Sequence, residues 1–144
     1  MHRFSRSAAL PIVIAVAALA GCGGTSGVGG QPPSARMERV GPHGALSVVL
    51  TRLGAQRVGI QTAVAAPAGG GRTVVPYSAL LYQVDGSSVI YTVTAPFTYT
   101  LVTASVTSIQ GNQVYLTGLA PGTTVVTVGG EELLGVQDGV GVET

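Results

Sequence analysis

The amino-acid sequence predicts a mainly β domain, a small β-barrel or β-roll of about six or seven strands with one short helix. After residue 21 the chain contains 20 Val against 10 Leu, and β-branched side chains favour pleated strands over helices. Apolar and polar residues alternate over Val89–Thr94, which is the period of a strand with one buried face. Short turn-forming pairs separate the apolar segments, as they do between the strands of hairpins.

The turn pairs predict where the strands lie. Asp85-Gly86 is expected to connect strands at 80–84 and 88–94, and Gly111-Asn112 to connect strands at 106–110 and 113–117. Pro121-Gly122 precedes a strand at 124–128, in which Val126 and Val128 are expected on one face. Pro76 and Pro96 are expected at strand starts or edges, where a missing N–H is tolerated.

Two further features interrupt the strand pattern. The alternating face of Phe97, Tyr99 and Leu101 changes parity at Val102, which predicts a β-bulge or a sharp twist. Thr51 is expected to cap a short helix at 52–57, with Gly59 just past its end. A second helical turn is expected at 131–134, before Gly135. The segment 65–72, which contains three consecutive glycines, is expected to be a loop.

The N-terminal 22 residues have the pattern of a bacterial lipoprotein signal. A basic start is followed by an apolar run at 8–20, which is about the length of a signal h-region and too short to span a bilayer. The run ends in Leu19-Ala20-Gly21-Cys22, which resembles a lipobox, with Leu19, Ala20 and Gly21 as the signal-peptidase recognition residues. This order is more consistent with a lipobox than with a cysteine buried in a core helix. We therefore expect residues 1–21 to be removed and Cys22 to carry a diacylglycerol, the only cofactor expected, which anchors the protein to a membrane of the cell envelope.

Residues 22–45 are expected to be a flexible Gly- and Pro-rich tether, with His43 exposed at its end, and residues 46–144 to be the β-rich domain. The net charge of +1 argues against a nucleic-acid partner. One Cys and two His are too few for a typical metal site. Lys is absent, and the six carboxylate side chains are not spaced like a pair for acid–base catalysis. We therefore expect that the protein has no catalytic residues and is not an enzyme.

Two pieces of the β region, behind the lipobox, resemble the membrane-proximal, C-terminal domain of HlyD-like periplasmic adaptor (membrane fusion) proteins of RND-type efflux pumps. The matching segments are 50–64, 75–82, 85–86, 89–92, 118–129 and 132–141. Full adaptors insert barrel, lipoyl-like and hairpin domains between the two pieces, and here residues 65–72 stand in their place. The resemblance implies a minimal adaptor-like module that lacks the hairpin.

The resemblance also implies a function. Such a domain is a non-catalytic module that contacts the ectodomain of an inner-membrane transporter, and the contact residues would include Tyr77, Tyr82, Arg52 and Arg57. Each of these four residues can also be an ordinary half-buried or solvated side chain. The alternative function is a stand-alone envelope lipoprotein that binds a small apolar ligand or organises the cell surface.

Overall fold

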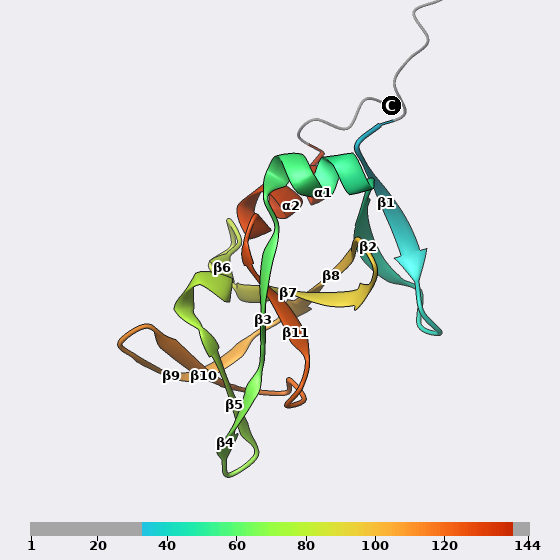
Figure 1. Ribbon diagram of the computed structural model, residues 1–144. Coiled ribbons are helices and arrows are strands. Elements are labelled where there is room, and N and C mark those ends of the chain that lie inside the picture. The colour runs from blue at the N-terminus through green and yellow to red at the C-terminus, as the bar shows by residue number, and fades with distance from the viewer. Residues whose placement is uncertain (1–32, 140–144) are drawn as a thin grey trace, which may run out of the picture. The chain divides into compact units, whose positions relative to one another are not determined.

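The computed structural model describes residues 33–139, which form eleven strands, two α-helices and one 3-10 helix (Figure 1). One sheet contains β1 (Ala35–Val40), β2 (Ala45–Leu50), β3 (Gln61–Val64), β6 (Leu81–Tyr82), β7 (Ser88–Ala95), β8 (Thr98–Thr103) and β11 (Thr124–Val128). The other contains β4 (Ala66–Gly69), β5 (Arg72–Pro76), β9 (Ser105–Gln110) and β10 (Gln113–Thr117). The helices are α1 (Arg52–Val58), the 3-10 helix η1 (Tyr77–Ala79) and α2 (Gly130–Gln137).

The predicted fold class is confirmed, because the protein is mainly β and has the character of a roll or sandwich. The strands of the first sheet follow the order β1-β2-β8-β7-β11-β3, with β6 also paired to β7, and those of the second follow β4-β5-β10-β9. The described chain thus forms two open sheets and not a closed barrel. It also has more strands than the six or seven expected, and a second full helix.

The domain begins earlier than the sequence predicted. Residues 35–40 were assigned to the tether, but they form β1, which pairs with β2 in an unbroken antiparallel register from Ala35↔Leu50 to Val40↔Ala45. Ala35 and Met37 pack against the core, while Arg36 and Glu38, which alternate with them along the strand, face solvent. The tether prediction is therefore wrong for residues 35–45. His43 lies in the turn of this hairpin and is exposed, as expected.

The β-bulge predicted at Val102 is not present, because β7 and β8 pair without a register shift from Val89↔Thr103 to Val93↔Tyr99. The chain moves from one sheet to the other two residues later. β8 ends at Thr103 in the first sheet, and β9 begins at Ser105 in the second. Between them, the buried Ala104 donates its N–H to the carbonyl of Ser88 at 2.8 Å.

The glycine-rich segment 65–72 is a hairpin and not a loop. Its residues supply β4 and the start of β5, which pair antiparallel with Ala66 opposite Val74. Gly70 and Gly71 make the turn with φ of 60° and 71°, a conformation that side chains disfavour. The segment is thus an integral part of the second sheet.

The other turns are confirmed, and two local expectations are not. Asp85-Gly86 connects β6 with β7, and Gly111-Asn112 connects β9 with β10. Phe97, expected in a strand, lies in the turn between β7 and β8 with φ of 56°. Val128 does not share the buried face of Val126, because the register of β11 against β3 shifts between these two residues.

The helix at 52–58 has the predicted caps. The N–H of Gly54 donates to Oγ1 of Thr51 at 3.0 Å, and Gly59 ends the helix in the left-handed conformation with φ of 71°. The second helix runs on past Gly135 to Gln137, so it is longer than the turn expected there. Both helices contribute buried residues to the same core.

Two hydrophobic cores lie on opposite faces of the seven-stranded sheet. The helix-side core lies between that sheet and the two α-helices and consists of Val48, Leu50, Ala55, Leu81, Val89, Tyr91, Tyr99, Val126 and Leu133. The inter-sheet core lies between the two sheets and consists of Ala65, Val75, Ala79, Leu80, Ile90, Ala104, Val114, Leu116 and Val125. The central strands are therefore buried on both faces.

Candidate functional site

The structure brings together the two tyrosines that the sequence analysis selected. β5 ends at Pro76, and the chain turns through η1, where the N–H of Leu80 donates to the carbonyl of Tyr77 at 3.0 Å. Leu80 and Leu81 then point into the two cores, which leaves Tyr77 and Tyr82 facing outward with exposed fractions of 42% and 53%. The neighbouring side chain of Tyr77 raises the pKa of the Tyr82 hydroxyl above its ordinary value.

A hollow of about 380 Å³ adjoins Tyr77, whereas Tyr82 is not among the residues that line it. Its lining comes from η1, the end of β11 and the start of α2, and consists of Tyr77, Ser78, Leu80, Leu81, Thr127, Val128, Gly129, Gly130, Glu131 and Glu132. The two glutamates lie in the first turn of α2, where the helix dipole favours negative charge. Both carboxylates line this hollow, although the two residues are adjacent in the chain. The surface combines exposed aromatic rings with two carboxylates, and we call it the tyrosine–glutamate surface.

Arg52 and Arg57 do not belong to that surface. Both are exposed residues of α1, at its first and penultimate positions, and neither lines the hollow. Arg57 lies in the last turn, where a cation interacts favourably with the helix dipole. Arg57 is therefore placed where it stabilises α1. Neither arginine lines the hollow that contains Tyr77.

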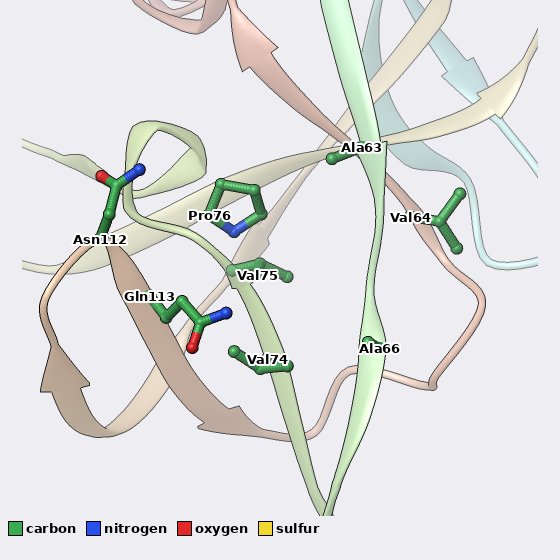
Figure 2. A pocket seen from close by; sticks show the side chains of 8 residues that line it. All are labelled: Ala63, Val64, Ala66, Val74, Val75, Pro76, Asn112 and Gln113. Carbon is green, nitrogen blue, oxygen red and sulfur yellow. The ribbon is translucent and has the colours of Figure 1, made fainter.

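A second hollow, of about 400 Å³, opens where β3 and β5 diverge (Figure 2). β4 pairs with β5, with Ala66 opposite Val74. If this register continued, Val64 would lie opposite Pro76. Pro76 has no N–H, so it cannot donate the next hydrogen bond between the strands. In Figure 2, Ala63 points toward Pro76, while Val64 lies on the other side of its strand. Asn112 and Gln113 supply the side-chain amides of this hollow. None of the described residues that line this hollow has a titratable side chain.

Asp85 and the pair formed by Arg36 and Glu38 make local contacts within their own segments. Asp85 is the turn residue that was predicted: its Oδ1 accepts from the N–H of Ser87 at 2.8 Å, and hydrogen bonds from Ser87 hold the pKa of Asp85 below its usual value. Within residues 33–139 the one ion pair joins Arg36 and Glu38 at 3.0 Å on the exposed face of β1. The same range contains no group of three His, Cys, Asp or Glu side chains arranged to hold a metal ion.

The lipidation residue Cys22 and the recognition residues Leu19, Ala20 and Gly21 lie outside the described residues. Neither helix within 33–139 has the length and apolar character required to cross a membrane.

The described residues define a small two-sheet β domain in which Tyr77, Glu131 and Glu132 line one hollow at the start of α2. No protein-family model, curated protein or solved structure matches the chain.

Proposed function

We propose that the protein is a lipid-anchored, non-catalytic module of the bacterial cell envelope that contacts the extracytoplasmic part of a membrane transporter of the efflux or secretion type. The anchor is supported by the N-terminal order of basic residues, apolar run, small residues and Cys22. The contact with a transporter is supported by the resemblance of 50–64 and 75–141 to adaptor membrane-proximal domains.

The single observation that carries the contact is the tyrosine–glutamate surface. Tyrosine is enriched in protein interfaces because its ring supplies apolar area while its hydroxyl remains hydrogen-bonded. Tyr77 and Tyr82 lie close to each other and are half exposed, and Glu131 and Glu132 add negative charge to the hollow that Tyr77 lines. A transporter surface that fits would present apolar side chains with arginine or lysine, because a cation can interact both with the rings and with the carboxylates.

The anchor is tested by growing cells with a clickable fatty acid and isolating the protein. We expect the wild-type chain to carry the label and to sediment with membranes, and Cys22→Ala to lose the label. An equal amount of label on Cys22→Ala would contradict lipidation at this residue.

The contact is tested by photo-crosslinking in intact cells. A photoreactive amino acid is placed at Tyr77 or Tyr82 and, as a matched control, at Ile109, whose exposed fraction of 45% is similar but which lies on β9 of the other sheet. We expect the tyrosine positions to crosslink to a subunit of a membrane transporter and Ile109 not to do so. Recovery of no transporter subunit, or equal recovery from Ile109, would refute the proposed contact.

A further inference from the structure

β1 is the last strand of the seven-stranded sheet, and one of its two edges has no partner among the described residues. Its other edge pairs with β2 in one unbroken antiparallel register. In Figure 1 the hairpin of β1 and β2 lies at the margin of the domain, with β1 outermost. An open strand edge presents unpaired N–H and C=O groups, to which another strand can bind.

Two hydrogen bonds show how the backbone of β2 alternates between its two neighbours. The N–H of Leu50 donates to the carbonyl of Phe97, on the β8 side, at 2.9 Å. The N–H of the next residue, Thr51, donates to the carbonyl of Ser34, on the β1 side, also at 2.9 Å. Bonded pairs therefore occur at every second position of the ladder between β1 and β2, and Ser34 belongs to one of them.

This alternation determines which groups of β1 lie on its open edge. Counting from Ser34 in the unbroken register, the residues that form bonded pairs with β2 are Arg36, Glu38 and Val40. The N–H and C=O groups of the residues between them point away from β2. The backbone groups on the open edge, to which no described residue bonds, are those of Ala35, Met37 and Arg39.

The side chains of β1 place one positive and one negative charge along this edge. Arg36 and Glu38 lie on one face of the strand, with 59% and 48% of their side chains exposed, and form an ion pair at 3.0 Å. On the other face, Met37 packs against the helix-side core, and Nη1 of Arg39 donates to the carbonyl of Gly44 in its own hairpin at 3.2 Å. A strand bound to the open edge would therefore meet Arg36 and Glu38 side by side.

A second copy of β1 fits this edge in one antiparallel register. If Met37 lies opposite Met37 of the second copy, the free backbone groups of the two edges face each other and can form a ladder. Arg36 then lies opposite Glu38 of the second copy, and Glu38 lies opposite its Arg36, which is a stabilising cross-strand arrangement. Arg39, the remaining charge of the strand, lies opposite the small side chain of Ala35.

The same charges disfavour the neighbouring registers. Moving one copy by two residues in either direction keeps the backbone groups matched, but it places Arg36 opposite Arg36 or Glu38 opposite Glu38. Like charges directly opposite each other are destabilising. Charges on an edge strand usually prevent pairing with other chains, and here their order permits pairing with one partner in one register.

We infer that the open edge of β1 binds the same edge of a second copy of this chain, which gives a two-fold symmetric dimer with one sheet continuous across the interface. The inference goes beyond the proposed transporter contact and does not depend on it, because no residue of β1 lines the hollow of the tyrosine–glutamate surface.

The test exchanges the charges in the full chain, dissolved in a density-matched detergent, and measures dimerisation by sedimentation equilibrium. Arg36→Glu and Glu38→Arg each give both positions the same sign, so like charges would meet in the dimer. We expect each single variant to dimerise at least about 4-fold more weakly than the wild type. An equimolar mixture of the two variants should recover the dimer, because each strand then meets the opposite charges.

Two further samples separate the contact between copies from other effects of charge. The double variant Arg36→Glu/Glu38→Arg keeps the complementary pattern and should dimerise as the wild type does. Recovery in the mixture cannot come from the ion pair of Arg36 and Glu38 within one chain, because neither single variant retains it. Arg72→Glu makes the same change of charge at an exposed residue of β5 in the other sheet, and it should also dimerise as the wild type does.

Amide hydrogen exchange, measured by NMR, tests the register. We expect the N–H groups of Ala35, Met37 and Arg39 to become protected as the protein concentration rises, whereas the alternate amides bonded to β2 are protected at every concentration. The inference is overturned if the wild type stays monomeric, if the single variants dimerise as tightly as the wild type, or if their mixture stays monomeric. Protection of these three amides that does not change with protein concentration would assign the edge to another segment of the same chain, and would also overturn it.

Discussion

Ile90 and Tyr91 are neighbours in β7 and each is 1% exposed, but they pack into different cores. Ile90 belongs to the inter-sheet core and Tyr91 to the helix-side core. Leu80 and Leu81, and Val125 and Val126, divide in the same way. The two cores thus share the strands β7 and β11 and the chain at Leu80 and Leu81, so we expect them to unfold together.

Ile90→Ala should destabilise the whole domain. Removal of a fully buried Ile side chain costs about 2–5 kcal/mol in lost burial and cavity formation. Urea unfolding followed by tyrosine fluorescence and by far-UV circular dichroism should show one common transition at lower denaturant. Val84→Ala, at a side chain that is fully exposed, should change the free energy of unfolding by less than about 0.5 kcal/mol. Two separate transitions in Ile90→Ala would show that the cores are independent.

Gly129→Ala should cost more stability than Gly122→Ala. Both glycines have positive φ, of 89° and 86°, so both substitutions introduce similar backbone strain, about 1–2 kcal/mol. A Cβ at Gly129 would also lie 2.6 Å from Cδ1 of Ile60 and 2.8 Å from Cγ1 of Val58, whereas a Cβ at Gly122 meets nothing within 4 Å. Thermal unfolding should therefore give the lower Tm for Gly129→Ala. Equal Tm values would argue against close packing between α2 and the end of α1.

Thr51→Ala should lose the N-cap of α1. Its hydroxyl accepts from the N–H of Gly54 at 3.0 Å, and loss of such a cap costs about 0.5–2 kcal/mol. Thr51→Ser keeps the hydroxyl and should recover most of this free energy in chemical denaturation. If Thr51→Ser is as unstable as Thr51→Ala, the methyl group and not the cap is responsible.

The stability should fall in alkaline solution partly because of Tyr91. Burial raises the pKa of this hydroxyl, the carboxylate of Asp138 raises it further, and the hydroxyl donates to Oε1 of Gln137 at 3.0 Å. The folded state therefore holds the proton more tightly than the unfolded chain, whose tyrosine pKa is about 10. This contribution is complete below that pH and is lost as the pH rises from there toward the folded pKa.

Urea unfolding at a series of pH values should show this loss. Tyr91→Phe has no ionisable hydroxyl, so its stability should decrease less steeply above pH 10 than that of the wild type. Identical slopes for the two proteins would mean that Tyr91 titrates normally in the folded state.

Much of the local structure followed from the sequence alone. The turns at Asp85-Gly86 and Gly111-Asn112, the helix after Thr51 and the mainly β class were all predicted, because each depends on the conformational preferences of adjacent residues. Alternation along β7 also predicted the buried face that contains Val89 and Tyr91.

The assignment of strands to layers depended on the tertiary structure. The parity change at Val102 was visible in the sequence, but it did not show that the chain changes sheet at Ala104, because the pattern of one strand does not identify its partners. For the same reason, the face of β7 that contains Ile90 was not expected to be buried. Residues 35–40 were assigned to the tether because the sequence did not show that they pair with β2.

The surfaces also depended on contacts between distant segments. Tyr77 and Tyr82 were selected from the sequence, but the position of Tyr77 in one hollow with Glu131 and Glu132 follows from the placement of η1 against β11 and α2. The hydrogen bond between Ser47 and Thr100 could not be foreseen, because these residues are 53 positions apart and meet only when β2 pairs with β8. The sequence by itself determined the mainly β class, the helix after Thr51 and the turns at Asp85-Gly86 and Gly111-Asn112, since these are short-range patterns. Only the tertiary structure decided which faces are covered and which side chains meet, because burial and hydrogen bonding depend on partners far away in the chain.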